Sequence, residues 1–427
     1  MLEAVSAVIW GPWTACVFML AGIFFSAQNG FFQLRHVRLW MRSTAGSLFK
    51  KRENGGISPV QSSLAALAGT LGTGNIVGVA AALAAGGPGA IFWMWCAAFF
   101  GMMISYSENV LGILYRQKTS AGGFLGGPMM YIEKGLGSPS AARLYAALCL
   151  LSAFAMGNMA QTGAIADSIS HSFDIHSSVI GAAVAFLAAP AVLRGTKGII
   201  RFTDRLVPVM AGAYIFICSA VIIINIKSLP SALASVFRGA FSLRAAGGGF
   251  GAAFLVGIRR GVFTNEAGLG TTVMIHSCAE TCTPTSQGMW GIFEVFADTM
   301  IVCTLTALAL LTTGRGIESA FSCVLGVFSD KFVALSLALF AFATVIAWSC
   351  YGEQVAVYLF GEKSRFPFRV LYLAAPLPGA LLGASGGIAL SDILNGMMCI
   401  LNLACVLLLS RQVSKETKRF VSRRRER

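Results

Sequence analysis

The chain has 427 residues, of which 56% are hydrophobic and only 12% are charged, and its formal net charge is +14. A soluble domain carries about 25% charged residues, so this composition excludes a protein that folds in water. The positive charge does not indicate nucleic acid, because the basic residues gather between apolar segments on one side of the topology derived below. We therefore expect an all-α protein that crosses a membrane many times.

Eleven apolar segments are expected to form membrane-spanning helices, since one span needs about 20 apolar residues. They cover residues 6–27, 57–85, 88–115, 141–170, 177–193, 205–226, 248–278, 286–313, 332–360, 367–385 and 387–410. The first segment begins with Glu3 instead of a basic residue, and a basic stretch follows it instead of a cleavage site. It is expected to be a retained helix and not a signal peptide.

Lysine and arginine are distributed unequally between the two sides of this topology. One side holds 25 of the 32, in 35–52, 116–143, 194–205, 363–369 and 411–427. Basic loops stay in the cytoplasm, which places the N-terminus outside and the C-terminus inside a cell membrane. The basic tail 411–427 is expected to touch anionic lipid.

The eleven segments divide into one extra helix and two groups of five. We predict an N-terminal helix and basic loop over 1–56, a first repeat over 57–226, an outer connection over 227–247, a second repeat over 248–410 and a tail over 411–427. Because five is odd, the second group enters the membrane from the opposite face. This arrangement is a 5+5 inverted repeat.

Each predicted repeat begins with a helix that glycine and small polar residues interrupt. The first interruption is Ala68–Asn75, and the second is Arg260–Gly268. A broken helix frees N–H and C=O groups at membrane depth, which are tolerated only where they line a cavity or bind something. A matching pair of breaks indicates the substrate and ion site of a transporter.

Five motifs, spread in order over nearly the whole chain, resemble the alanine or glycine:cation symporter family. They are Gly72–Ile76, Gly86–Ala90 with Phe92–Trp95, Gly127–Met130 with Tyr131–Lys134, Arg260–Gly270, and Trp348 and Ser349 with Tyr351–Glu353. Members of that family are similar in fold to the bacterial leucine transporter, which agrees with the 5+5 arrangement. Ala347, Cys350 and the run Thr271–His276 depart from the family's usual residues, so the resemblance leaves the preferred amino acid open.

The first break offers donors for the carboxylate of an amino acid. A helix that begins afresh there presents unpaired N–H groups, so Thr73 and Gly74 are the expected donors. Glycine lets a ligand approach the backbone closely. The alternative is a glycine-rich face for helix packing. Asn75, which is polar at membrane depth, favours binding.

The second break offers acceptors for the ammonium group. Gly268 helps to bracket it, Phe263 is expected to wall the side-chain pocket, and Thr264 supplies a hydroxyl near a cation. Glu266 is an ionisable group at membrane depth, which indicates function by default. Its alternative role is structural, as the partner of Arg259 or Arg260, which are expected near the outer gate.

Two further residues are expected at the pocket by the resemblance. Gln161 is an amide on an otherwise apolar helix, and a buried amide needs partners. The resemblance makes its partner the polar end of the substrate, and a hydrogen bond to a neighbouring helix is the alternative. Trp348 is expected to cap the pocket, with ordinary packing as its alternative.

Sodium prefers oxygen ligands, and no cofactor besides this co-transported ion is expected. By analogy with the leucine-transporter fold, the carbonyls of Ala68 and Leu71 and the hydroxyl of Thr344 are its ligands. Back-bonding of Thr344 to its own helix is the alternative. Glu294 and Asp298, four residues apart, are interpreted as part of a cytoplasmic network with basic residues, or else as a proton relay. Glu108 receives the same structural interpretation.

The sequence therefore predicts a symporter that imports a small neutral amino acid, alanine or glycine, together with sodium. Proton coupling through Glu266 or Glu294 is the nearest alternative. A membrane sensor of amino acids that does not transport them is an alternative of another class. An intramembrane enzyme is disfavoured, because His276 is the only histidine expected within a span. The oligomeric state stays open.

Overall fold

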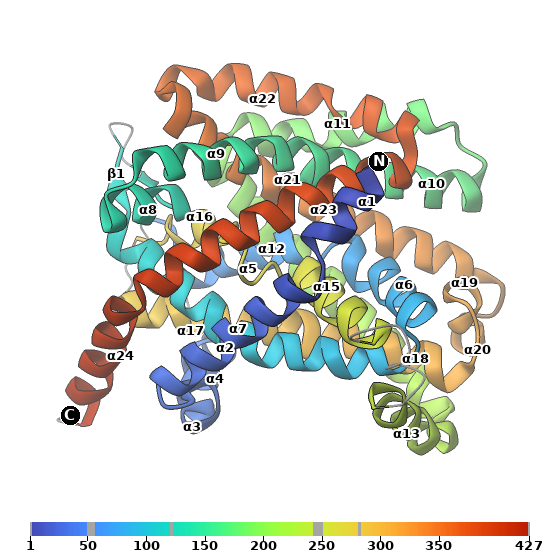
Figure 1. The fold of residues 1–427 in the computed structure, drawn as a ribbon. Coiled ribbons are helices and arrows are strands. Elements are labelled where there is room, and N and C mark those ends of the chain that lie inside the picture. The colour runs from blue at the N-terminus through green and yellow to red at the C-terminus, as the bar shows by residue number, and fades with distance from the viewer. Residues whose placement is uncertain (1, 49–55, 120–122, 242–250, 281–282, 426–427) are drawn as a thin grey trace.

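The computed structural model describes residues 2–48, 56–119, 123–241, 251–280 and 283–425. Long helices run side by side along one direction, and short elements connect them at both ends (Figure 1). The elements are α1 Leu2–Ile9, α2 Pro12–Gln28, α3 Phe32–Arg35, α4 Val37–Ser43, η1 Ala45–Ser47, α5 Pro59–Thr70, η2 Thr73–Asn75, α6 Val77–Gly86, α7 Gly89–Tyr115, β1 Gln117–Lys118, β2 Phe124–Leu125, α8 Pro128–Leu136, α9 Pro139–Phe154, η3 Ala155–Ala160, α10 Gln161–Phe173, α11 Ser177–Leu193, α12 Gly195–Ile224, η4 Ile226–Ser228, α13 Leu229–Ala240, α15 Ala252–Asn265, α16 Val273–His276, α17 Pro284–Val295, η5 Phe296–Cys303, α18 Thr304–Thr313, α19 Ile317–Ala320, α20 Ser322–Leu325, η6 Gly326–Phe328, α21 Ser329–Phe360, η7 Glu362–Ser364, α22 Arg365–Ala374, α23 Pro376–Leu408 and α24 Ser410–Arg425. The segments η3 and η5 are π-helical, and β1 pairs antiparallel with β2.

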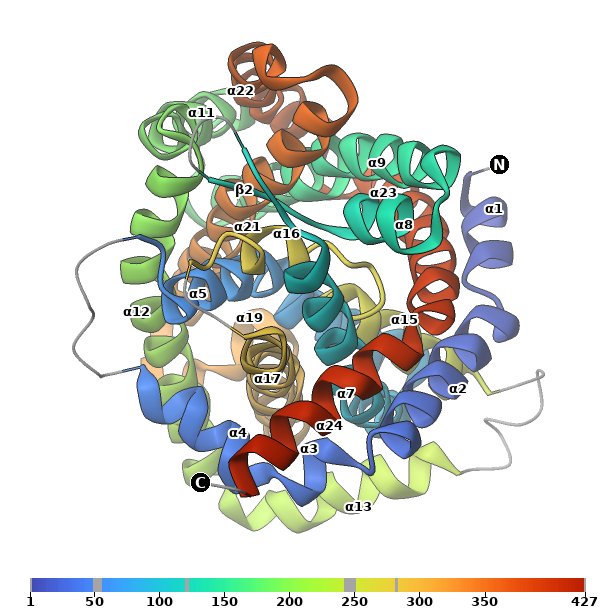
Figure 2. The ribbon, with the colours of Figure 1, turned by 90° about the vertical axis from the view of Figure 1, so that its left-hand side faces the viewer.

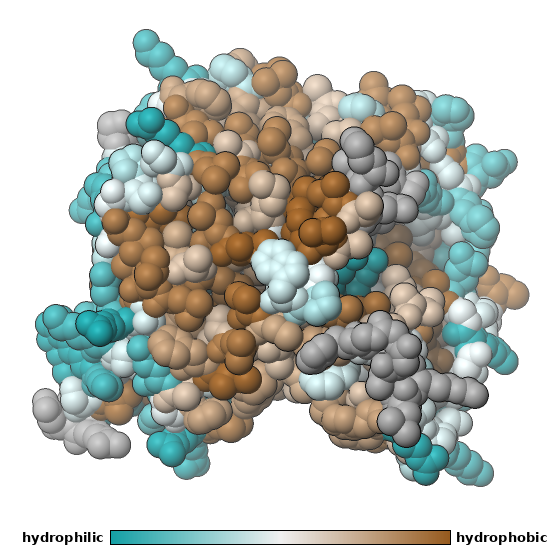
Figure 3. Space-filling view, viewed as in Figure 1, coloured by the Kyte–Doolittle hydropathy of each residue, from teal (hydrophilic) through white to brown (hydrophobic). Residues whose placement is uncertain are grey.

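The described helices confirm an all-α membrane protein. Eight are long and apolar enough to cross a membrane, and α6 and α11 are shorter apolar helices. The space-filling view shows a hydrophobic band between hydrophilic left and right ends (Figure 3). Such a band is what a hydrocarbon core of about 30 Å requires of the surface that faces it. The total of eleven spans stays a prediction.

The helices differ from those expected at three places in the chain. α12 begins at Gly195 and not at residue 205, so the basic stretch before the span is helical. With 30 residues it is about 45 Å long, which exceeds the hydrocarbon core and carries those charges beyond it. The break expected at 386 lies at Gly383, whose φ of 69° kinks α23; the candidate span Glu362–Ala384 ends beside it, and Leu390–Leu408 follows. The tail forms the helix α24.

The broken helices lie inside the bundle. Viewed along the helices, α5, α7 and α16 are surrounded by α12, α9, α23, α2 and other helices (Figure 2). Every residue from Ser62 to Thr70 on α5 is buried. α7 packs along both α15 and α17, while α21 packs against α5 and α12. The centre of the molecule is thus built from the segments that contain the interruptions.

The N-terminal helix pair is joined to this core at Asp392 of α23. The indole Nε1 of Trp10 donates to the Asp392 carbonyl at 2.7 Å. The Asp392 carboxylate forms an ion pair with Arg259 of α15, and Arg259 also donates to the hydroxyl of Ser6 at 2.8 Å. Three separate parts of the chain therefore meet at one acidic residue.

Close packing of α15 on α7 predicts that Gly257 cannot be enlarged. A Cβ there would lie 2.5 Å from the Ala90 carbonyl oxygen and 2.6 Å from Trp93 Cβ. Gly257→Ala should therefore lower the melting temperature of the purified protein, whereas Gly212→Ala, which meets no atom within 4 Å, should leave it unchanged or raise it. Equal melting temperatures for both variants would contradict this packing.

Candidate functional site

The first interruption separates α5 from α6, as the sequence predicts. α5 ends at Thr70, a 3₁₀ turn covers Thr73–Asn75, and α6 begins at Val77. The Asn75 side chain closes the gap, because its Oδ1 accepts the Gly72 N–H at 3.0 Å. Gly72 lies so close to α21 that a Cβ would be 2.7 Å from the Thr344 hydroxyl. Glycine is therefore required there by close approach.

The second interruption follows α15. Glu266, Gly268 and Gly270 have positive φ values of 55°, 86° and 75°, which take the chain out of the helix before α16. Among the described residues, the carbonyls of Phe263 and Thr264 accept no hydrogen bond. They stand at the C-terminal end of a helix, where the partial charge is negative. Carbonyls in this position are suited to accept from a cationic group, and their role in binding the ammonium group stays a prediction.

Glu266 is held within its own break and by α21. Its carboxylate accepts hydrogen bonds from the Thr271 hydroxyl and, at 2.9 Å, from Trp348 Nε1. The expected alternative, an ion pair with Arg259 or Arg260, is wrong. Arg259 pairs with Asp392, as described above, because α15 turns it toward α23 and the N-terminal helix. Arg260 lies over the Phe263 ring, with Cζ 5.9 Å from its centre.

Asp298 joins the two interruptions. Its Oδ1 accepts from Asn75 Nδ2 at 2.6 Å, and its Oδ2 accepts from the Thr299 hydroxyl at 2.8 Å. Asn265 at the end of α15 donates to the same hydroxyl at 3.1 Å. The interpretation of Asp298 as part of a network with basic residues is therefore wrong. Its position in the middle of an apolar segment was the signal that could have found this role.

Four of the expected pocket residues come together where the breaks face each other. Gln161 Oε1 accepts a hydrogen bond from the Thr73 N–H at 3.3 Å. The N–H group that was expected to bind the substrate carboxylate is therefore bonded to the side-chain amide of Gln161. A Cβ on Gly74 would lie 2.7 Å from Thr264 Cγ2. The Thr264 hydroxyl donates to the Gly261 carbonyl at 2.9 Å. α10 thus meets the first break, and α15 meets it from another side.

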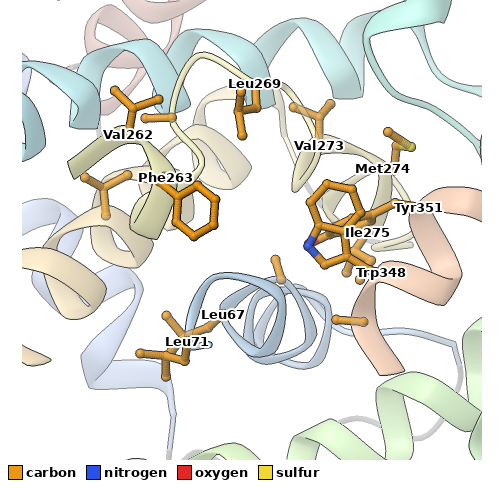
Figure 4. Close-up of a cluster of buried hydrophobic side chains, with 14 of the residues drawn as sticks. Leu67, Leu71, Val262, Phe263, Leu269, Val273, Met274, Ile275, Trp348 and Tyr351 are labelled. Atoms are coloured by element: carbon orange, nitrogen blue, oxygen red, sulfur yellow. The ribbon is translucent and has the colours of Figure 1, made fainter. Parts of the chain in front are cut away.

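Phe263 and Trp348 lie on either side of the end of α5 (Figure 4). Trp348 is fully buried, and Gly157 of η3 is so near that a Cβ there would be 2.5 Å from Trp348 Cβ. Gly268 is not brought to this place. Its carbonyl accepts from Asn402 at 2.9 Å, and a Cβ would meet α2 and α23.

Oxygen atoms gather around the hydroxyl of Thr344. Its Oγ1 lies 3.2 Å from the Ala68 carbonyl oxygen, 3.4 Å from that of Leu71 and 3.2 Å from that of Phe340. A hydroxyl has one proton and can satisfy only one of these acceptors well. The first two carbonyls belong to the end of α5, where a helix carries partial negative charge. This cluster has the chemistry of a site for a hard cation.

The remaining acidic residues have partners that the sequence did not predict. Glu294 Oε2 lies 2.9 Å from His276 Nε2, and Glu108 accepts from Asn402 Nδ2 at 2.5 Å. A network with basic residues was expected for Glu294 and Glu108. Glu294 has only His276 as such a partner and Glu108 is bound by an amide, so this expectation is wrong for both. Within the described ranges, no three His, Cys, Asp or Glu side chains cluster as a metal site would require.

This fold, with two broken helices in the core of an apolar bundle, is that of a secondary membrane transporter. It is similar to the crystal structure of MhsT in complex with L-phenylalanine, with a TM-score of 0.57, 14% identity and coverage of 86% of this chain and 99% of that one. The match shows the leucine-transporter fold, which confirms the expected fold class.

The chain belongs to the sodium:alanine symporter family, whose family model matches residues 1–427. It is 36% identical to the sodium/alanine symporter AgcS of Methanococcus maripaludis, with 98% of this chain and 96% of that protein covered. It is 33% identical to the probable sodium/glutamine symporter GlnT of Bacillus subtilis, with 98% and 90% covered. The protein is therefore a multi-pass membrane transporter of amino acids and not an enzyme.

The bond between Trp348 and Glu266 predicts an unequal effect of two tryptophan substitutions. Trp348→Phe removes one of the two donors to the buried Glu266 carboxylate and leaves Oε1 without a hydrogen-bond partner among the described residues, which costs about 1–3 kcal/mol. Trp95→Phe removes a bond to the neutral hydroxyl of Thr304 at a half-buried position. Denaturation of the purified protein should show the larger loss for Trp348→Phe, and a loss no larger than that of Trp95→Phe would contradict the role of the bond.

Proposed function

We propose that this protein imports a small neutral amino acid, alanine or glycine, together with sodium. The observation that carries the proposal is the group of carbonyl oxygens around Thr344 at the first break. Sodium binds such oxygens, and they belong to the segment that also faces the second break. The names of AgcS and GlnT support sodium as the coupled ion and an amino acid as the cargo.

In the proposed complex, the substrate carboxylate takes the N–H groups of Thr73 and Gly74 and displaces the Gln161 amide oxygen. The ammonium group lies against the carbonyls of Phe263 and Thr264, which accept no hydrogen bond from any residue that the structure describes. Phe263 walls the side-chain pocket. Asn75, Gly268 and Trp348 then act by holding the two breaks in shape.

Coupling follows from the place of the sodium site. A cation held by the Ala68 and Leu71 carbonyls stabilises the end of α5, and so favours the arrangement of Thr73 and Gly74 that binds the substrate. It acts only to the extent that it binds this conformation better than the alternative one. One charge that crosses a membrane potential of 100 mV supplies about 2.3 kcal/mol. This free energy can maintain a substrate concentration ratio of more than tenfold across the membrane.

The proposed movement is a rocking of two groups of helices. α5–α7 and α15–α18 move against α9–α11, α21 and α22, so that the breaks face each side of the membrane in turn. We place the N-terminus outside and the C-terminus in the cytoplasm of a cell membrane, because of the 25 basic residues on one side. The tail helix α24 then lies where anionic lipid is found.

Uptake of labelled alanine into proteoliposomes tests this function. An inward sodium gradient should drive accumulation, and unlabelled alanine and glycine should compete better than larger amino acids. Uptake that persists without sodium but stops when the pH gradient is removed would favour proton coupling instead. Binding of alanine without uptake or counterflow would favour a sensor.

The sodium site predicts a specific effect at Thr344. Thr344→Val keeps the shape of the side chain and removes the hydroxyl, so the sodium concentration for half-maximal uptake should rise about tenfold or more, equivalent to about 1.4 kcal/mol. Ser349→Ala is the matched control, because that buried hydroxyl bonds to the Ile346 carbonyl of its own helix at 2.6 Å. If both variants need the same sodium concentration, Thr344 is not a ligand.

The contact between the two breaks predicts that Gly74 cannot be enlarged. Gly74→Val forces atoms into the Thr264 methyl group and should abolish uptake while the protein still reaches the membrane. Gly78→Ala, one turn on, is the control, because its Cβ would be 3.9 Å from the same methyl group. Normal uptake by Gly74→Val would remove this glycine from the site.

A further inference from the structure

A histidine and a glutamate form a buried pair between α16 and α17. His276, the last residue of α16, and Glu294, on the final turn of α17, have side chains that are 0% and 2% exposed. Their Nε2 and Oε2 atoms are 2.9 Å apart. The other carboxylate oxygen, Oε1, has no hydrogen-bond partner within the described part of the chain. An unpaired carboxylate oxygen at such a depth is costly.

The second ring nitrogen of His276 faces an amide. Gln287 Nε2 lies 2.6 Å from Nδ1, and an amide nitrogen can only donate. With the amide assigned in this orientation, Nδ1 accepts, and the arrangement fits a ring whose single proton is on Nε2 and is directed at Glu294. The same amide nitrogen also reaches the hydroxyls of Ser62 and Ser63 on α5, at 3.2 and 3.4 Å. Gln287 thus links the pair to the first broken helix.

The titratable groups around the pair are mostly acidic side chains. The groups that face it from the packed elements are Glu108 on α7, Glu266 in the second break, Asp298 on η5 and Tyr351 on α21. α5 contributes no titratable residue. Arg116 binds the carbonyls of Ser277 and Ala279, and α4 presents its arginines to the surface. No described Lys or Arg side chain forms an ion pair with Glu294.

We propose that His276 and Glu294 form a site that binds one proton and makes the attachment of α5 to α17 depend on pH. With the neutral ring and an ionised Glu294, the pair carries one negative charge and has no cationic partner. One proton neutralises the pair.

Gln287 transmits the binding of the proton. A protonated ring donates from both nitrogens, so Nδ1 no longer accepts from the Gln287 amide. The amide then turns its oxygen, which has no partner among the described residues, toward Nδ1–H. Its NH₂ group leaves Ser62 and Ser63, and α17 loses its hydrogen bonds to the start of α5. Acidification is therefore expected to loosen the first half of the broken helix.

Nuclear magnetic resonance of ring-labelled histidine in the purified protein tests the site without any transport. The chain has four histidines, and the signal missing from His276→Gln assigns His276. We expect the chemical shift of this signal to change with pH, and this change to differ in Glu294→Gln. A His276 signal that does not respond to pH, or that is the same in Glu294→Gln, would overturn the proposal.

Hydrogen exchange tests the consequence for α5. After correction for the intrinsic rate, the start of α5 should exchange faster at about pH 6 than at about pH 8, and this difference should vanish in His276→Gln. His171→Gln, at an exposed position on α10, should keep it. A pH difference that survives in His276→Gln would disprove the link. Neither measurement depends on sodium or on the substrate, so failure of the proposed function would leave both outcomes readable.

Discussion

The structure depends on one constraint, which is that a helix broken inside a membrane must satisfy the backbone groups that it frees. Both breaks satisfy freed N–H groups in the same way. Asn75 Oδ1 accepts a hydrogen bond from the Gly72 N–H, and Asn265 Oδ1 accepts one from the Ala267 N–H. Each asparagine then directs its NH₂ group at η5, to Asp298 or to the hydroxyl beside it. One π-helical turn therefore sets the relative position of the two breaks.

The acidic residues of the two proposed moving groups are held in different ways. Glu353 of α21 is bound by Arg365 and Arg369, with N–O distances of 2.7 and 2.6 Å. By contrast, the bond that joins Glu266 to α21, across the two groups, comes from the neutral indole of Trp348. Parting a buried carboxylate from a neutral donor separates no opposite charges, whereas breaking a buried ion pair is strongly unfavourable. Neutral donors thus suit contacts that must open, and ion pairs suit those that stay closed.

Much of this arrangement could be predicted from the sequence, because glycine and apolar runs act locally. The composition indicated the membrane, and Ala68–Asn75 and Arg260–Gly268 marked the breaks. The partners of Asp298 could not be predicted, since Asn75 lies 223 residues away in the chain. The orientation of Gly268 also escaped prediction, because a glycine has no side chain whose chemistry indicates a direction.

The contacts of Asp392 connect the N-terminal helix pair to the second broken helix. This residue holds Arg259 through its side chain and Trp10 through its carbonyl. If α15 tilts away from α23, it must either break a largely buried ion pair or drag the first span with it. The contacts at Asp392 therefore couple any such tilt of the second broken helix to the first span.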